Sequence, residues 1–289
     1  MPSNDFSLPD LTGKTYVITG ANIGLGQQTA VNLTRAGAAV VMACRNQDKA
    51  RAAEAAIRAL VPTARLEHVR IDLADYASVR DAAADILKRF DKIDGLVNNA
   101  GLFFDAFKVN GAGHEMTLAT NHLGGFLLTN LLLDRLKASP GARVVTVSSD
   151  AHRLGKVDFD DLHGDAGWGG WRAYGTSKLA NIYFTRALAR RLEGSGVTAN
   201  CCHPGFVASN FGETNASFMD QVVRLSKVFA ITTEQGARTQ SWLAGSAEAA
   251  GQSGGYFYKC RIAKPNSLAR DDAAAERLWT LSEKLVGLA

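Results

Sequence analysis

The sequence predicts an α/β protein in which a single doubly wound parallel sheet is covered by helices on both faces. Short apolar runs rich in β-branched residues alternate with amphipathic, helix-like stretches along the whole chain. The strand-like runs are apolar on both sides, which is typical of strands buried between two helical layers. No linker rich in proline, glycine or serine divides the chain, so residues 1–289 are expected to form one domain.

The predicted strands and helices follow one another in alternation. Strands are predicted at residues 15–19, 39–43, 66–71, 95–97, 143–147, 197–202 and 255–258. Helices are predicted at residues 24–36, 46–60, 78–90, 115–136, 174–192, 234–243 and 272–285. Two long stretches, 150–172 and 206–228, lack a regular pattern and follow strands. They are expected to be substrate loops at the carboxyl edge of the sheet, where ligands bind in such folds.

Composition and charge argue against several classes of protein. The 32 basic and 28 acidic residues are scattered and leave a net charge of +4, so nucleic-acid binding is not expected. The four cysteines and six histidines show no metal-ligand spacing and no disulfide framework, so we expect no metal and a reduced, cytoplasmic setting. Asp5 and Asp10 argue against a signal peptide, and no apolar run approaches the roughly 18 residues that a membrane span needs.

The first predicted strand leads into a glycine-rich turn that suits a dinucleotide. Gly20, Gly24 and Gly26 follow the spacing G-x-x-x-G-x-G. Gly20 permits a tight turn, Gly24 lets backbone amides approach a pyrophosphate, and Gly26 lets the helix pack closely on the strand. The helix N-terminus adds partial positive charge. We therefore predict that this loop, including Asn22 and Ile23, binds the cofactor of a Rossmann fold; a tight turn without a ligand is the alternative.

The end of the second predicted strand bears on the choice between NAD and NADP. Many NAD-binding sheets carry an acidic residue there, against the adenosine ribose. This chain has Arg45, whose guanidinium can stack on adenine and pair with a 2′-phosphate. NADP(H) is therefore the predicted cofactor, and a solvated surface arginine is the alternative. Asp72 and Leu73 end the third strand, where they are expected to meet the adenine ring.

Tyr174 and Lys178 are the candidate reacting pair. They lie four residues apart on a predicted helix and so share one face. A tyrosine with an ordinary pKa of about 10 is a poor acid or base at neutral pH, but a nearby cation stabilises the phenolate and lowers that pKa. Lys178 can supply this charge and also hold the nicotinamide ribose. The pair follows a strand that ends in Ser148 and Ser149, at the edge of the sheet that faces the cofactor.

Taken together, these motifs resemble those of the short-chain dehydrogenase/reductase family. The resemblance spans nearly the whole chain, and the motifs occur in the family's order: residues 19–26, Asp72, residues 98–101, Asn121, Ser149, Tyr174 with Lys178, and Pro204 with Gly205. Within the third of these motifs, Asn98 is expected to be a structural amide.

The resemblance implies a role for each matching residue. Ser149, the last serine of its strand, would hold the substrate carbonyl by a hydrogen bond; a serine that merely caps the strand end is the alternative. Tyr174 would give its proton in reduction and accept it in oxidation. Asn121 would help to hold Lys178 and a proton-relay water, and a core amide is its alternative. Cofactor contacts are implied for Asn99, Ala100, Gly101, Pro204 and Gly205.

Finer matches indicate the branch that contains retinol dehydrogenases and plant protochlorophyllide reductases. They comprise residues 42–45, 120–124, 177–181 and 282–289. The chain departs from the usual family pattern at residues 150–173, an insertion similar to that of retinol dehydrogenases. Large apolar side chains near the expected cleft favour an apolar substrate, although each taken singly could be a packing residue: Phe103, Phe104, Leu154, Trp168, Trp171, Phe206, Phe211 and Phe218.

We therefore expect an NADP(H)-dependent oxidoreductase that interconverts an apolar aldehyde or ketone and its alcohol by hydride transfer, with Tyr174 as general acid and base. Two alternatives stay open. One is light-dependent reduction of a tetrapyrrole double bond, which the branch implies. The other is a sensor or scaffold that binds NADP without turnover. The resemblance further implies a homodimer or homotetramer formed through the long helices at 115–136 and 174–192.

Overall fold

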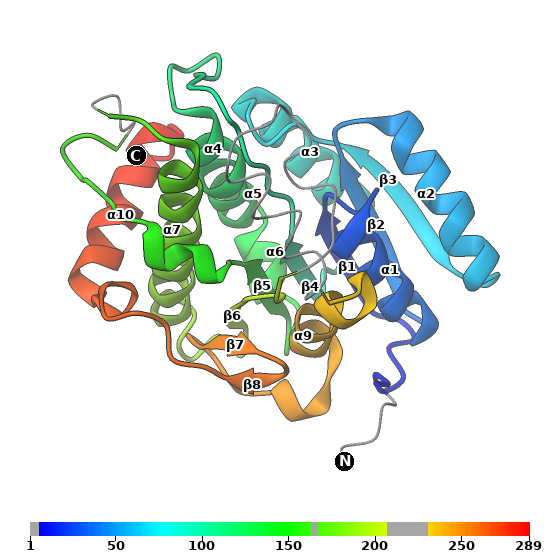
Figure 1. Ribbon diagram of the computed structural model, residues 1–289. Coiled ribbons are helices and arrows are strands. Elements are labelled where there is room, and N and C mark those ends of the chain that lie inside the picture. The colour runs from blue at the N-terminus through cyan, green and yellow to red at the C-terminus, as the bar shows by residue number, and fades with distance from the viewer. Residues whose placement is uncertain (1–5, 163–166, 207–230) are drawn as a thin grey trace.

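A computed structural model of the chain describes residues 6–162, 167–206 and 231–289 (Figure 1). Of the predicted substrate loop at 206–228, only Phe206 is among the described residues. Phe211 and Phe218, which we expected near the cleft, lie outside them.

Eight strands form one sheet in the order β3-β2-β1-β4-β5-β6-β7-β8. Seven are parallel, and β8 pairs antiparallel with β7 at one edge. β1 pairs with both β2 and β4, so the direction of winding reverses beside β1, as in a doubly wound fold. The strand bounds are β1 Thr15–Thr19, β2 Ala39–Cys44, β3 Arg65–Arg70, β4 Gly95–Asn98, β5 Arg143–Val147, β6 Thr198–Cys202, β7 Tyr256–Tyr258 and β8 Arg261–Ile262.

Helices cover both faces of this sheet (Figure 1). Buried side chains of α1, α2 and α9 form one apolar cluster with the sheet, and those of α3, α5 and α7 form a second cluster. The predicted doubly wound α/β fold is confirmed. The helix bounds are α1 Gly24–Arg35, α2 Gln47–Leu60, α3 Tyr76–Arg89, α4 Met116–Leu118, α5 Gly124–Leu131, α6 Leu133–Lys137, α7 Gly170–Arg191, α9 Thr233–Gly245 and α10 Asp272–Leu285.

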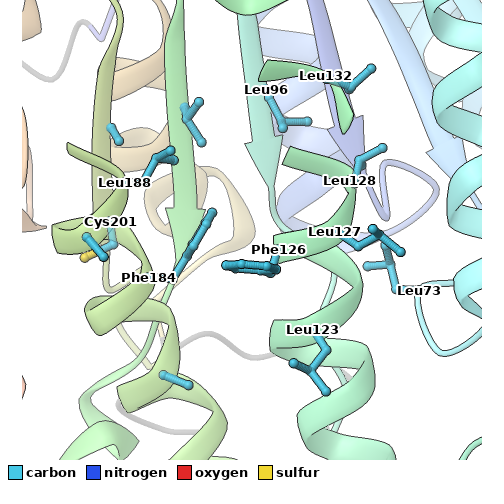
Figure 2. Close-up of a cluster of buried hydrophobic side chains, with 14 of the residues drawn as sticks. Leu73, Leu96, Leu123, Phe126, Leu127, Leu128, Leu132, Phe184, Leu188 and Cys201 are labelled. Atoms are coloured by element: carbon cyan, nitrogen blue, oxygen red, sulfur yellow. The ribbon is translucent and has the colours of Figure 1, made fainter. Parts of the chain in front are cut away.

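The two clusters exist because successive strand side chains point to opposite faces. On β1, Val17 belongs to the α3–α5–α7 side, whereas Tyr16 and Ile18 belong to the α1–α2–α9 side. Figure 2 shows the α3–α5–α7 cluster, in which the rings of Phe126 on α5 and Phe184 on α7 meet edge to face. This buried layer fixes α7, the helix that carries Tyr174 and Lys178, against the sheet.

The helix predicted at 115–136 is wrong as one continuous α-helix. Residues Ala119–Leu123 form a π-helical turn between α4 and α5, and Leu132 separates α5 from α6. The apolar pattern runs through both interruptions, so periodicity could not reveal them. The residue that follows the π turn, Gly124, must be a glycine, because a Cβ there would lie 2.2 Å from the carbonyl oxygen of Leu73. Such turns often occur at functional sites, and this one contains Asn121.

The structure has three further elements or parts of elements where the sequence predicted no regular structure. The predicted loop at 150–172 begins with a 3-10 helix at Asp150–Leu154, and α7 begins at Gly170, four residues before the prediction. The edge strand β8 has only two residues and was not predicted. Two residues give no alternation to detect, which explains its absence from the prediction.

The C-terminal helix α10 packs along the outer side of α7 (Figure 1). The ring of Trp279 stacks on Phe184 of α7, at 5.9 Å between centroids, and meets the edge of Phe126 of α5 at 4.8 Å. Arg190 of α7 binds Glu276 of α10 at 2.7 Å. A homodimer or homotetramer stays a prediction, but the outer side of α7, where we expected its interface, is covered by α10 of the same chain.

We expect Trp279→Ala to lower the free energy of unfolding by about 3–5 kcal/mol, because it empties a buried site between three helices. Urea unfolding measures this loss. Leu268→Ala is the matched control: Leu268 is 51% exposed, and such surface changes cost about 0.5 kcal/mol or less. A loss for Trp279→Ala as small as that of the control would contradict the placement of α10 in the core.

Candidate active site

The glycines after β1 are required by the local geometry. Gly20 and Gly24 have φ of +67° and +58°, a backbone region that favours glycine. A Cβ on Gly26 would lie 2.4 Å from the carbonyl oxygen of Gly20 and 2.5 Å from the Asn99 side chain. The three positions therefore form a tight turn on which α1 packs directly.

A group of hydrogen bonds holds this turn against the end of β4. The Thr19 hydroxyl accepts from the backbone amides of Asn99 and Ala100, both at 3.0 Å. The side-chain amide of Asn99 donates to the backbone carbonyl of Thr19 at 2.9 Å. Gln240 of α9 then donates to the Asn99 side chain at 3.1 Å and to Thr29 of α1 at 2.5 Å. Gln240 was not predicted from the sequence, because a polar residue in an amphipathic helix does not indicate such a contact.

The N-terminus of α1 is suited to an anion. Its N-cap residue, Ile23, makes no side-chain capping hydrogen bond and is 60% exposed. The first amides of a helix otherwise lack partners, and their dipole favours negative charge. The amides of Ala21 and Asn22 instead hydrogen-bond to the buried thiol of Cys44, whose pKa burial raises to about 11. The turn thus fits a cofactor pyrophosphate, because the amides at the start of α1 can donate to an anion.

Arg45 and Asp72, which we predicted at the adenosine end of the cofactor, follow the adjacent strands β2 and β3. The Arg45 guanidinium and the Asp72 carboxylate approach to 3.7 Å, and their side chains are 65% and 35% exposed. An ion pair this long and this exposed contributes little to stability. Asp72 also accepts a hydrogen bond from the amide of Ala74, and the backbone of the adjacent Leu73 packs against Gly124.

Tyr174 and Ser149 meet at the carboxyl end of β5. Burial raises the pKa of Tyr174, and a hydrogen bond with the Ser149 side chain partly offsets this effect. Ser148 faces elsewhere, because its hydroxyl donates to the carbonyl of Lys178 at 2.8 Å and ties β5 to α7. The two adjacent serines are therefore not equivalent, and Ser149 is the one beside the tyrosine.

Lys178 is buried next to this pair. Its ammonium donates to the carbonyl of Val147 at 3.1 Å and lies 5.4 Å from the centre of the Tyr174 ring. Burial lowers the pKa of Lys178 to about 8, and the nearby Cys202 thiol acts in the opposite direction. Asn181 also donates to the Val147 carbonyl, at 3.2 Å. The end of β5 is thus held by two side chains of α7, of which only Lys178 was predicted.

Asn121 bonds to the segment that lies against Lys178. Its side chain accepts from the amide of Leu102 at 2.7 Å, donates to the Leu102 carbonyl at 2.9 Å, and donates to the Ser177 hydroxyl at 3.0 Å. A Cβ on Gly101 would come within 3.0 Å of the lysine nitrogen and 3.4 Å of the Asn121 oxygen. Asn121 therefore fixes the segment after β4, and the glycine lets that segment lie against Lys178.

Asn98, at the end of β4, is buried, and its side-chain amide donates to the Thr129 hydroxyl at 2.9 Å. Asn98 therefore has the structural contacts that we expected.

Pro204 and Gly205 follow β6, at the same carboxyl edge of the sheet as Ser149. Gly205 has φ of +95°, and a Cβ there would meet Ile231 at 2.6 Å.

The start of the insertion is packed tightly on α7. A Cβ on Gly155 would lie 2.3 Å from the carbonyl oxygen of Gly175, and a Cβ on Gly175 would lie 2.6 Å from that of Ala151. The Thr176 hydroxyl donates to the carbonyl of Lys156 at 3.1 Å. Because Gly175 directly follows Tyr174, this contact brings the Ser149 turn to the tyrosine. The close approach could not be seen from either glycine alone.

Two aromatic rings lie next to Tyr174. Phe103 lies 5.0 Å from Trp171 and 6.1 Å from Tyr174, and Trp171 lies 6.2 Å from Tyr174, all between ring centroids. Leu154 and Phe206 are 62% and 44% exposed. These are residues that the sequence placed near the cleft.

The described part of the chain holds no helix long and apolar enough to span a membrane, and no cluster of three or more metal-ligating side chains.

Comparison with known proteins identifies the family of this arrangement. Residues 14–219 match the family model for short chain dehydrogenase. The chain belongs to the short-chain dehydrogenase family. It is therefore an oxidoreductase that uses a nicotinamide cofactor on alcohol or carbonyl groups.

Its relatives among curated proteins lie in the predicted branch. It is 43% identical to retinol dehydrogenase 12 of Mus musculus, over 96% of this chain and 88% of that protein. It is 43% identical to human retinol dehydrogenase 14, over 96% and 87% of the two chains. A solved structure of an uncharacterised protein from Mycobacterium paratuberculosis is 34% identical and matches 97% of this chain and 96% of the other, with a TM-score of 0.79. The retinol dehydrogenase-like branch is confirmed.

We expect Lys178→Met to raise the free energy of unfolding at pH 7 by up to about 3 kcal/mol, although it removes a residue proposed to act in catalysis. The folded-state pKa of about 8 lies below the ordinary value of 10.5, so the unfolded chain binds more protons between these two values and the native state gains stability as the pH rises. The difference between variant and wild type should therefore shrink from pH 8 to pH 10.5.

Urea unfolding at pH 7 and at pH 10.5 measures this difference in the free energy of unfolding. Lys137→Met, which changes an exposed lysine, is the control and should alter stability by about 0.5 kcal/mol or less at either pH. If Lys178→Met is less stable than the wild type at pH 7, the ammonium is not the destabilising buried charge described above.

Proposed function

We propose that this protein is an NADP(H)-dependent reductase of apolar aldehydes or ketones, reversible as a dehydrogenase of the matching alcohols. One observation carries this proposal: the buried Tyr174 hydroxyl bonds to the Ser149 side chain, and the Tyr174 ring lies near Lys178 and next to the rings of Phe103 and Trp171. The polar groups suit a carbonyl oxygen, and the rings suit an apolar substituent.

The residues proposed to hold the cofactor follow its length across the carboxyl edge of the sheet. Arg45, Asp72 and Leu73 would bind the adenosine end. Lys178 and Tyr174 would bind the nicotinamide ribose. The pyrophosphate and nicotinamide contacts are assigned to Gly20, Asn22, Ile23, Gly24, Gly26, Asn99, Ala100, Gly101, Pro204 and Gly205. When bound, the cofactor supplies the hydride for reduction or accepts it in oxidation.

The chain's own groups would move the proton. In reduction, Ser149 donates a hydrogen bond to the substrate carbonyl and so holds it in place. As the carbonyl carbon gains the hydride, the carbonyl oxygen takes a proton from the Tyr174 hydroxyl. The positive charge of Lys178, which with a pKa of about 8 is mostly protonated at pH 7, stabilises the resulting phenolate. Asn121 is proposed to keep the segment next to the lysine in place and to help hold a relay water.

NADP(H) is preferred because the strand end carries Arg45 rather than a carboxylate. The long contact with Asp72 is weak enough for the guanidinium to turn toward a 2′-phosphate. A planar guanidinium can bind such a phosphate through two hydrogen bonds. Two relatives named retinol dehydrogenases also support an apolar alcohol as the reverse-direction substrate.

We expect Tyr174→Phe to lower kcat for reduction of apolar carbonyls by about 10²–10⁴-fold, because it removes the proton donor but keeps the ring. The binding constant for NADPH, measured by fluorescence, should weaken by about 10-fold or less, because only one hydrogen bond to the nicotinamide ribose is lost. Tyr183→Phe is the matched control, since Tyr183 is a buried tyrosine of the same helix whose hydroxyl donates to the Leu268 carbonyl. Wild-type turnover by Tyr174→Phe would refute the mechanism.

A panel of apolar carbonyls and alcohols, and an illuminated assay with protochlorophyllide, test the two alternatives. Tight NADPH binding by the wild type without turnover of any carbonyl or alcohol would favour a sensor or scaffold. Turnover of protochlorophyllide only under illumination would favour the tetrapyrrole reductase.

We expect Arg45→Ala to reduce kcat/KM with NADPH by about 10- to 100-fold, the loss of a charge-assisted hydrogen bond worth about 1.5–3 kcal/mol, and to leave kcat/KM with NADH nearly unchanged. Arg51→Ala serves as the control, because Arg51 is an exposed arginine of α2 that pairs with Asp48. Equal kinetics of the wild type with NADH and NADPH would contradict the assignment of Arg45.

A further inference from the structure

We propose that two neutral histidines, His152 and His203, are positioning residues that hold the Ser149–Asp150 turn for the reaction. This inference rests on the proposed role of Ser149, and it adds two residues that neither the sequence motifs nor the family comparison singled out. His152 lies in the 3-10 helix that follows β5, and His203 lies at the end of β6. They bond to the backbone of the turn at successive residues.

His152 links the turn to the C-terminal part of the chain. Its Nδ1 lies 2.7 Å from the carbonyl oxygen of Ser149, and its Nε2 accepts from the backbone amide of Asn266 at 3.2 Å. A backbone amide can only donate and a carbonyl can only accept, so Nε2 is unprotonated and Nδ1 carries the proton. Both ring nitrogens are thus satisfied only in the neutral ring. The side chain is fully buried.

His203 holds the next residue of the turn from the other side. The amide of Asp150 donates to His203 Nδ1 at 3.3 Å, which places the proton of the neutral ring on Nε2. That Nε2 faces the Asp150 carboxylate at 3.6 Å. The imidazole also stacks on Tyr258 of β7, at 5.1 Å between centroids. His203 directly precedes Pro204 and Gly205, so it connects the serine turn with the strand end proposed to approach the nicotinamide.

The surrounding charges are compatible with neutral rings. Asp150 faces both histidines, and Arg153, from the same 3-10 helix, approaches that carboxylate at 3.6 Å. On the β7 side, Tyr256 donates to Asp150 at 3.2 Å, and its ring lies 5.3 Å from His152. Burial lowers the pKa of His152 and of His203, and the Asp150 carboxylate only partly opposes this. Both rings therefore stay neutral at pH values where an exposed histidine would begin to titrate.

Protonation would break one hydrogen bond of each histidine, that of His152 with Asn266 and that of His203 with Asp150. A proton on Nε2 of His152 would face the Asn266 amide, and a proton on Nδ1 of His203 would face the Asp150 amide. The lowered pKa values mean that these two hydrogen bonds are complete above the ordinary histidine pKa of 6.5 and are lost as the pH falls through the lower folded-state values. Displacement of a substrate-holding group by about 1 Å can cost about 10²-fold in rate.

The first experiment compares two variants of His152 in the full chain. His152→Phe keeps a ring but removes the donor to Ser149, and we expect kcat to fall by about 10- to 100-fold with the NADPH binding constant unchanged. His152→Asn places an amide nitrogen near the position of Nδ1, and we expect it to restore kcat to within about threefold of the wild type. Equal kcat for His152→Phe and the wild type would overturn the proposal.

A second pair guards against misfolding of His152→Phe. His203→Asn retains an acceptor near the position of Nδ1, whereas His203→Leu does not, so we expect only His203→Leu to lose kcat. The doubled variant His152→Asn with His203→Asn cannot titrate at either position. We expect the acid-side fall of kcat/KM below pH 6.5 to be weaker in it than in the wild type. An unchanged acid limb, or equal kcat in the two His203 variants, would contradict the proposal.

A readout without substrate separates failure of this inference from failure of the proposed function. Side-chain NMR of isotopically labelled histidine reports the tautomer and the pKa of each ring, with signals assigned through the Asn variants. We expect His152 with its proton on Nδ1 and His203 with its proton on Nε2, both more than half neutral at pH 6.5. The opposite tautomers would overturn the inference even in an active enzyme, and the expected ones would support it even if no carbonyl were turned over.

Discussion

The buried ammonium of Lys178 is the constraint on which the arrangement of the site depends. In the part of the chain that the structure describes, no carboxylate pairs with it, and the Val147 carbonyl is its hydrogen-bond acceptor. A buried charge without a counter-ion is costly. The fold holds it there because α7 is fixed between the sheet and α10, and because Asn181 bonds to the same carbonyl. The resulting charge lies where a tyrosine phenolate would need it.

The rest of the site is assembled around this helix by close backbone approaches. Gly26 brings α1 onto the first turn, Gly101 brings the segment after β4 against Lys178, and Gly155 brings the insertion onto α7. Side-chain amides then fix what the glycines allow to approach: Asn99 and Gln240 at the phosphate loop, and Asn121 beside the lysine. Most of these contacts join segments far apart in the sequence, so the geometry depends on the whole sheet being formed.

The sequence predicted most of the fold because strand and helix periodicity and the glycine turn are local signals. It also predicted the residues that surround the proposed reaction, and the structure brings Ser149, Tyr174 and Lys178 together at one edge. The π turn at Asn121 and the docking of α10 through Trp279 were not predicted. Both depend on contacts between distant segments, and neither changes the apolar pattern. The bonding of His152 to Asn266 is of the same kind, since 114 residues separate the two.

The most direct test of the proposed acid–base chemistry is an ultraviolet difference titration of tyrosinate, with and without saturating NADP⁺. Subtracting the Tyr174→Phe protein isolates the Tyr174 signal from those of the other five of six tyrosines. Burial raises the pKa of Tyr174 in the protein alone, and the positive charge of a bound oxidised nicotinamide should lower it again. We expect the Tyr174 signal to appear at a lower pH with NADP⁺ than without it. The same titration midpoint in both conditions would contradict a role for Tyr174 as the general acid and base.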